Sequence, residues 1–508
     1  MSSRNKRIAH NTLMLYIRMI LVMGITLYTS RIVLKELGVE NYGIYNVVGG
    51  VVAMFNLLVG SLRAATQRFI TFELGKSENR QLKRIFSASV TIHFIISIVI
   101  FILAESIGIW FLNTQMNIPV ERMVAANWVF QCSVFTFIIN LISVPYNAAI
   151  IAYEKMSVFA YISVVEGILS LIIVYLLALT NYDKLIVYAL LLLSVAFIIR
   201  LIYVKFCASC LSECKFSFLW DKLLFREMFS FIGWNFIGAG SGVLMTQGVN
   251  IVLNIFCGVT INAARGIATQ VQTAVMSLTY NFMTAFNPQI TKSFAAGENE
   301  YLQKILRQGA KFSYLLMLML ALPILMETKT ILSIWLNKVP EYTVVFVRLI
   351  IVYSLILCIS TPLVTAMLAT GKIKRYQIIV GGFQLLNFPF SFVALMLGAS
   401  PVMTYVFQIV FEICCLSSRL WLLREMIGFE TKKFIFQVLQ RIFLISIISL
   451  FFPMIFIYYF EPSISRFVCV TILSIAAVII FTILFGLSHS EKSFLVEQTK
   501  MIARKIQR

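Results

Sequence analysis

Long apolar stretches, each separated from the next by a short polar segment, run along almost the whole chain. A helix that crosses the hydrocarbon core of a bilayer needs about 20 mostly apolar residues. Stretches of this length predict fourteen membrane-spanning helices, at about 12–34, 43–62, 85–112, 120–145, 157–180, 185–205, 229–257, 266–288, 310–336, 342–370, 376–398, 402–424, 434–460 and 465–488. The longest segments between them, 63–84 and 206–228, are too short for a soluble catalytic domain.

The composition agrees with this pattern. Hydrophobic residues make up 60% of the 508 positions and charged residues 13%, and the mean hydropathy is +0.90. An ordinary soluble domain is about half apolar and a quarter charged. A single water-soluble core cannot bury this much apolar surface, so the composition excludes a soluble enzyme.

The positive charges predict the orientation of the spans. With the N-terminus inside, 32 of the 42 lysines and arginines fall in the inner segments, nine fall at the outer ends and loops, and Arg18 lies within the first span. Inner loops of membrane proteins carry this excess of positive charge. We therefore expect both termini in the cytoplasm, and we attribute the net charge of +20 to topology and contact with membrane lipids, with no nucleic acid as partner.

The chain repeats itself about 220 residues further on. The matches join residues that are uncommon in apolar spans, and the clearest are Gly38-Val39 with Gly258-Val259, Ile70-Thr71 with Ile290-Thr291, Glu78-Asn79 with Glu298-Asn299 and, at a shift of 217, Ile142-Ser143 and Pro145 with Ile359-Ser360 and Pro362. The shift contains six spans, and an even number preserves orientation. The repeats are therefore expected to be parallel copies, related by a pseudo-two-fold axis along the membrane normal.

The predicted fold class is an all-α integral membrane protein of about fourteen helices, in two parallel six-helix lobes plus two C-terminal helices. The expected parts are an N-lobe at 1–205, a cytoplasmic linker at 206–228, a C-lobe at 229–424, spans 13 and 14 at 425–488 and a basic cytoplasmic tail at 489–508. Two similar lobes are typical of transporters that work by alternating access, with the substrate held where the lobes meet.

Arginines within or near the spans are the first candidates for substrate binding, because a charge at membrane depth is costly and usually functional. Arg18 lies inside the first span. Arg31 is near its outer end, where it either faces a cavity or extends to the lipid headgroups. Arg265 opens the eighth span, where topology alone also explains it. A cavity lined by these arginines would suit an anionic substrate, since guanidinium matches phosphate oxygens in a bidentate geometry.

Amides and acids within the spans are the second group of candidates. Asn56 and Asn250 belong to clusters of amides that can bind sugar hydroxyls, with hydrogen bonding between helices as the alternative. Glu166 and Glu412 lie near the middle of their spans. Each either forms an ion pair with an arginine or takes up a coupling proton or sodium ion.

Neither a catalytic site nor a metal site is predicted. Cys207, Cys210 and Cys214 cluster at the end of a span, but a zinc site would need a fourth ligand in a compact loop. His10, His93 and His489 are all distant in sequence. The chain also lacks a nucleophile elbow, a phosphate-binding glycine loop and a metalloprotease helix, so we expect a transporter without a cofactor.

The N-terminal part resembles a known family. Asn11-Thr12-Leu13, then Ser30-Arg31, then Leu37-Gly38 followed by Tyr42-Gly43-Ile44-Tyr45 resemble the opening of the O-antigen and polysaccharide flippases of the multidrug/oligosaccharidyl-lipid/polysaccharide (MOP) exporter superfamily. The resemblance implies a flippase of the bacterial inner membrane for an undecaprenyl-pyrophosphate-linked oligosaccharide. It also implies that Arg18 and Arg31, with Arg265 as a third, supply cationic cavity residues, and that polysaccharide polymerase or chain-length machinery is a partner.

Two other functions stay open. A cation-coupled exporter of small molecules or drugs, from the same superfamily, would need acidic residues in its cavity, whereas the first lobe offers mainly arginine. A membrane-embedded polysaccharide polymerase or ligase would carry a large outer loop with catalytic residues, and the outer segments here are short.

Overall fold

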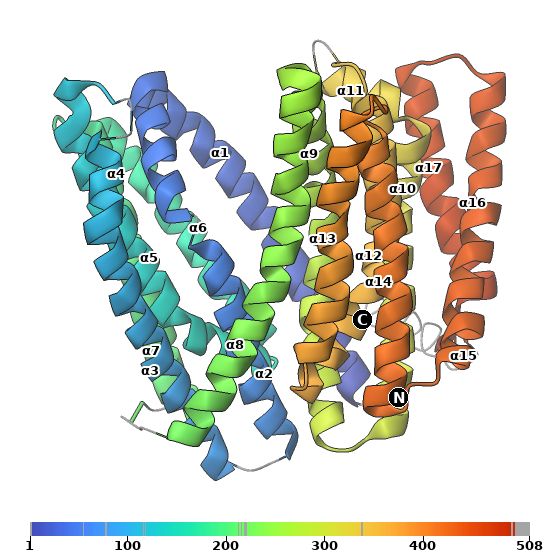
Figure 1. Cartoon of the computed structure of the whole chain (residues 1–508), viewed down its shortest axis with the longest axis horizontal. Coiled ribbons are helices and arrows are strands. Elements are labelled where there is room, and N and C mark those ends of the chain that lie inside the picture. The colour runs from blue at the N-terminus through green and yellow to red at the C-terminus, as the bar shows by residue number, and fades with distance from the viewer. Residues whose placement is uncertain are drawn as a thin grey trace, which may run out of the picture. The chain divides into compact units, whose positions relative to one another are not determined.

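Every regular element in the described part of the chain is a helix (Figure 1). The computed structural model describes residues 3–53, 55–76, 79–114, 116, 118–211, 213–214, 216–217, 221–336, 339–488 and 491–492. Within these residues, eleven helices are long and apolar enough to cross a membrane. A membrane protein of the predicted all-α class is therefore confirmed, and the remaining predicted spans, 12–34, 43–62 and 266–288, are helical over most of their length.

The helices have the following bounds. In the first half they are α1 (Ser3–Ala53), α2 (Asn56–Lys76), α3 (Asn79–Leu103), α4 (Ile109–Thr114), α5 (Met123–Ala152), α6 (Met156–Leu179), α7 (Lys184–Cys210), α8 (Lys222–Val243) and α9 (Val249–Ala295). In the second half they are α10 (Asn299–Met326), α11 (Thr328–Trp335), α12 (Thr343–Thr370), α13 (Lys374–Met396), α14 (Met403–Ile427), α15 (Thr431–Phe434), α16 (Gln440–Tyr459) and α17 (Ile464–Phe481). A 3-10 turn at Val120–Arg122 and π-helical turns at Ala104–Gly108, Leu244–Gly248, Ile435–Leu439 and Thr482–Gly486 adjoin them.

The first predicted span and the first half of the second lie in one long helix, α1, which bends at Gly38. The backbone there has φ 75° and ψ 166°, a conformation that only glycine adopts at little cost. The chain then continues in α2 to Lys76, so most of the predicted inner segment 63–84 is helical rather than an open loop. Arg68 lies over the rings of Phe69 and Phe72, 4.6 and 4.7 Å from their centroids. Hydropathy marks where the apolar part of a helix stops, not where the helix itself ends.

The chain divides into two compact units. The first lobe, as we use the term from here on, consists of Ile8–Phe236 together with Thr291–Gly297, and the second lobe contains Ile237–Ile290 and the described residues from Glu298 onward. The chain passes from one lobe to the other within α8, and it does so again near the end of α9. Each lobe is described below by itself.

Pairs of helices pack in the same order in the two lobes, as the sequence repeat implies. In the first lobe α3 contacts α5, α5 contacts α7, and α6 contacts α7. In the second lobe the corresponding pairs are α10 with α12, α12 with α14, and α13 with α14. The repeated prolines occupy matching places too, since Pro145 lies inside α5 and Pro362 lies inside α12.

The last two helices, α16 and α17, pack against α10 of the second lobe (Figure 1). Two ion pairs link α10 to α17 and to the segment that follows it, one near the middle of α10 and one at its C-terminal end. Lys311 Nζ lies 2.7 Å from Glu491 Oε2, with both side chains less than 10% exposed, and Arg466 Nε lies 2.7 Å from Glu327 Oε1. Removing one partner of a buried pair is costly, so the C-terminal helices form part of the second lobe.

Asp183 starts α7 in the predicted outer loop between α6 and α7. Its Oδ1 accepts hydrogen bonds from the backbone N–H groups of Leu185 and Ile186, at 2.9 and 3.3 Å. Its Oδ2 accepts one from Arg122 Nη1 at 2.6 Å. An aspartate in this position satisfies free N–H groups of the first helical turn. Burial opposes ionisation, but Arg122 and the two N–H groups hold the pKa of Asp183 below its ordinary value of 3.8.

Replacing Asp183 with alanine is expected to lower the free energy of unfolding by about 1–2 kcal/mol, since it removes a helix cap. The loss is measured by thermal unfolding of the purified protein in detergent. Because the pKa is depressed in the folded state, the contribution of the carboxylate is present at neutral pH and disappears as the pH falls below about 3.8. Equal stability of the two proteins at pH 7 would contradict this assignment.

Candidate functional site

Arg18 lies in α1 among side chains of the first lobe. Its guanidinium carbon is 4.5 Å from the centroid of the Phe159 ring on α6, and its Nε is buried with no hydrogen-bond partner among the residues that the structure describes. Glu166 on α6 and Tyr203 on α7 are near enough to interact with it electrostatically. Arg18 is thus partly covered by an aromatic ring and retains an N–H donor that no described residue of the lobe accepts.

Tyr203 connects Arg18 to further polar residues. Its hydroxyl accepts a hydrogen bond from Asn147 Nδ2 on α5, at 3.2 Å, and it also interacts electrostatically with Glu166, Arg18 and Arg63 of α2. The first-lobe cluster, as we call this group, consists of Arg18, Arg63, Asn147, Glu166 and Tyr203. Two cations and one acid from five helices give it a net positive charge.

Sequence reasoning predicted only part of this cluster. It identified Arg18 and Glu166 as candidates and treated Arg63 as an ordinary basic residue of an inner segment. It missed Asn147 and Tyr203, although a polar residue within an apolar helix was an available signal for both. The sequence does not indicate that Asn147 and Tyr203, which are 56 positions apart in the chain, contact each other.

A cavity of about 240 Å³ lies elsewhere in the first lobe, and α5 supplies its polar wall. It is lined by Tyr45, Gly49, Val52, Cys132, Ser133, Thr136, Phe137, Asn140, Ala189 and Leu192. Ser133, Thr136 and Asn140 are spaced by three and four positions, so they share one face of the helix. Asn140 is exposed. Hydroxyl and amide groups at membrane depth indicate a face that meets water or a polar ligand rather than lipid.

Arg265 and Asn250, both predicted substrate ligands, contact each other inside the second lobe. Arg265 Nε donates to Asn250 Oδ1 at 2.5 Å, and Nη2 donates to the carbonyl of Thr246 at 3.2 Å, within a π-helical turn. Its guanidinium carbon is 5.2 Å from the centroid of the Tyr405 ring. Arg265 is only 4% exposed, so in this conformation it holds an irregular turn in place. Its Nη1 is nevertheless buried without a hydrogen bond to any described residue.

Glu412 forms an ion pair deep in the second lobe. Its Oε1 lies 2.5 Å from Arg419 Nη1, and both side chains are almost fully buried. The same Arg419 nitrogen donates to Ser360 Oγ at 2.9 Å. The structure thus places Glu412 in the ion-pair arrangement, whereas Glu166 lies in the first-lobe cluster.

Two other predicted site residues lie outside the described side chains. Arg31 belongs to α1 and Asn56 begins α2, but the described part of the structure does not include their side chains. Their predicted roles therefore stay predictions.

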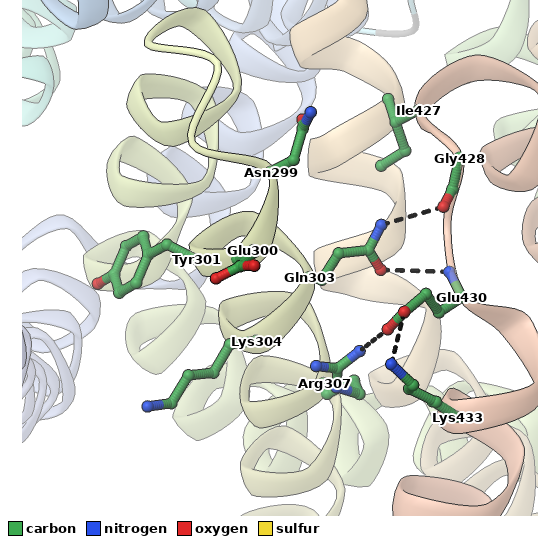
Figure 2. Close-up of a pocket in the computed structure, with 10 residues that line it drawn as sticks. All are labelled: Asn299, Glu300, Tyr301, Gln303, Lys304, Arg307, Ile427, Gly428, Glu430 and Lys433. Atoms are coloured by element: carbon green, nitrogen blue, oxygen red, sulfur yellow. Dashed lines mark hydrogen bonds and ion pairs between the residues drawn. The ribbon is translucent and has the colours of Figure 1, made fainter.

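A larger cavity, of about 840 Å³, lies in the second lobe between the start of α10 and the turn after α14 (Figure 2). Figure 2 shows Arg307 and Lys433 converging on Glu430, at 3.2 and 2.6 Å. Gln303 bonds to the backbone of Gly428 and Glu430. Because Glu430 neutralises the cations closest to it, this cavity is a weaker candidate for anion binding than the first-lobe cluster.

Comparison with known proteins gives the family context. Residues 240–393 match the sequence profile of the MatE family. The chain is also 21% identical over 307 residues to the "Uncharacterized membrane protein EpsK" of Bacillus subtilis (strain 168). That alignment covers 60% of this chain and 60% of the relative.

Two solved structures with a similar fold are transporters. A multidrug resistance MATE family transporter of the MOP superfamily, in an outward-facing conformation, matches with a TM-score of 0.73 at 12% identity, over 84% of this chain and 96% of that one. A MOP superfamily transporter from Pyrococcus furiosus, described as having a binding pocket of reverse polarity that suggests a different function, matches with a TM-score of 0.69 at 11% identity, over 82% and 95%. Identities this low establish the fold alone.

These matches bear on the predicted class of protein. MatE proteins and the structural neighbours are transporters rather than enzymes, as the sequence predicted for this chain. The chain therefore has the fold of the MATE transporters of the MOP superfamily and matches the MatE family over residues 240–393.

Proposed function

We propose that the protein is a flippase that moves an undecaprenyl-pyrophosphate-linked oligosaccharide across the bacterial inner membrane by alternating access. In this proposal the pyrophosphate and glycan pass through the protein, while the prenyl tail stays in lipid. Both termini lie in the cytoplasm. The partners are the lipid-linked oligosaccharide, membrane lipids and the polysaccharide polymerase or chain-length machinery that receives the product.

The observation that carries the proposal is the charge and geometry of the first-lobe cluster. Arg18 and Arg63 outnumber Glu166, and the Nε of Arg18 has no hydrogen-bond partner among the described residues of the lobe. A guanidinium with a free donor is suited to a phosphate oxygen. Phe159 lies against its face and holds the fork in a fixed orientation, which reduces the entropy lost when a phosphate binds.

The hydroxyl-bearing cavity supports the glycan part of the proposal. Ser133, Thr136 and Asn140 provide donors and acceptors on one face of α5, and Tyr45 adds an aromatic ring. Sugars are bound by this combination of polar groups and flat apolar surface. A cavity of about 240 Å³ would hold one sugar unit rather than a whole repeat.

Export of small organic cations is the second candidate function. It is favoured by the likeness to a multidrug resistance transporter and by Glu166, an acid exposed within α6. A cationic drug would have to approach Glu166 beside Arg18, and like charges repel in a medium of low dielectric constant. We therefore place this function second.

A deletion strain separates the two functions. If the protein flips lipid-linked glycan, its loss is expected to leave undecaprenyl-linked oligosaccharide accumulated on the inner leaflet and to deplete the surface glycan, with drug sensitivity unchanged. Normal surface glycan in a strain without a redundant gene would contradict the proposal. Greater sensitivity to cationic drugs together with normal glycan would favour the exporter.

A further inference from the structure

The turn between α5 and α6 holds an acidic residue in an unusual backbone conformation. Glu154 has φ 59°, in the left-handed region that residues with a side chain rarely adopt. Its N–H bonds to the carbonyl of Ile151 at 2.9 Å, and the N–H of Lys155 bonds to that of Ile150 at 3.1 Å. Glycine is the usual residue at this position of a helix end.

The sequence repeat shows that glutamate is the exception here. A shift of 217 residues places Glu154 on Gly371, which ends α12 with φ 76°. The backbone geometry is therefore common to both copies, and only the second copy has the residue that suits it. Glutamate is strained at this position, so a contact of the Glu154 side chain is expected to explain why glutamate occupies it.

That side chain forms a buried ion pair with the end of α9. Glu154 Oε1 lies 2.6 Å from Lys292 Nζ, and the glutamate side chain is 1% exposed. At a shift of 220 the residue that corresponds to Lys292 is Phe72. Both partners thus differ from their counterparts in the other copy, so the ion pair is not a product of the repeat.

The end of α9 fits closely against α2 beside this pair. The rings of Phe72 and Phe294 are 6.2 Å apart between centroids. At Gly75 an added Cβ would lie 2.7 Å from Ala295 Cβ and 2.7 Å from the carbonyl oxygen of Lys292, so only glycine is accommodated. This packing belongs to the first lobe, although α9 lies in the second lobe as far as Ile290.

We propose that the Glu154–Lys292 ion pair is a releasable latch that fastens the predicted inner end of α9 to the first lobe. The proposal rests on the proposed transport by alternating access, in which one lobe moves against the other. Since α9 runs from Val249 to Ala295 with Pro288 inside it, its end cannot follow the second lobe while it stays attached to Glu154 unless the helix bends near the proline. The pair must break, or α9 must bend, once in each transport cycle.

A thiol at position 293 reports release of the latch. Ser293 is 2% exposed, so Ser293→Cys is expected to react slowly with a membrane-impermeant maleimide added to inside-out vesicles. With Glu154→Gln or Lys292→Gln added, the rate should rise roughly tenfold, within the range typical of couplings between conformations. Mass spectrometry of the peptide that carries position 293 separates this thiol from the nine native cysteines.

Two further variants guard against misfolding and non-specific effects. Glu154→Gly removes the carboxylate while giving the turn the residue found at Gly371, so it should label as fast as Glu154→Gln without loss of thermal stability. Glu425→Gln breaks the exposed Arg375–Glu425 pair and should leave the labelling rate unchanged. Equal rates in the parent, Glu154→Gln and Glu154→Gly proteins would overturn the latch.

Crosslinking distinguishes failure of the latch from failure of the proposed function. Glu154→Cys with Lys292→Cys, joined by a short reversible thiol crosslinker, is expected to block transport until the link is cleaved. Transport that continues while the link is intact would overturn the latch. If position 293 responds as expected but no lipid-linked glycan moves in any variant, the proposed substrate fails and the latch stands.

Discussion

Replacing Arg18 with alanine is expected to reduce translocation of lipid-linked glycan about 30- to 100-fold, with the protein still folded and in the membrane. A hydrogen bond to a charged group contributes about 1.5–3 kcal/mol, and the expected reduction corresponds to the loss of one such bond. Arg18→Lys keeps the charge but loses the planar fork, so it should retain about a tenth of the activity. The rate is measured with labelled lipid-linked oligosaccharide in proteoliposomes.

The control for Arg18 is an arginine with no expected substrate contact. Arg375 lies at the start of α13 in an exposed pair with Glu425, and Arg375→Ala should transport at the parent rate. Immunoblots of membranes establish that the variants are present in equal amounts. Transport at the parent rate by Arg18→Ala would contradict a role of the first-lobe cluster in substrate binding.

The second large effect is expected at the buried pair of Arg419 and Glu412. Replacing Arg419 with methionine leaves the Glu412 carboxylate buried without its cation, which should cost about 3–5 kcal/mol of stability. Replacing both, as Arg419→Met with Glu412→Leu, should restore most of that loss, because an apolar pair of similar volume avoids the cost of burying charge. Thermal unfolding in detergent measures both.

The same variants test whether Glu412 couples transport to an ion. If the pair is purely structural, the double variant should transport at close to the parent rate once it is stable. A double variant that is stable but no longer responds to a proton or sodium gradient would instead make Glu412 a coupling site. A single Arg419→Met variant as stable as the parent would contradict the ion-pair assignment.

Much of the fold could be predicted because the bilayer constrains the sequence of a membrane protein in two simple ways. Span length and loop charge depend on the bilayer, so apolar runs and lysine and arginine counts indicate helices without any knowledge of packing. The repeat added the prediction that the two halves are copies of each other, and the helices of the two lobes do pack in the same order. The ends of helices were harder, as α2 shows: it continues to Lys76 because nothing in hydropathy requires a helix to stop at the membrane surface.

Some of the positive charges that were assigned to inner segments are buried within the second lobe. Lys311 and Arg419 were counted with the inner positive charges, yet the structure pairs Lys311 with Glu491 and Arg419 with Glu412 inside the second lobe. A charge near a predicted span end can face the interface or a partner on another helix, and only packing distinguishes the two. Glu154 was missed for the same reason, since its partner is 138 residues away.

Reconstituted flipping measures the proposed transport of lipid-linked oligosaccharide itself. Purified protein in proteoliposomes is supplied with fluorescent undecaprenyl-pyrophosphate-linked oligosaccharide in one leaflet, and quenching by an impermeant reagent reports its arrival in the other. We predict translocation that depends on the protein and falls about 30- to 100-fold in Arg18→Ala. No translocation by the parent protein, in vesicles that do export a cationic drug, would contradict it.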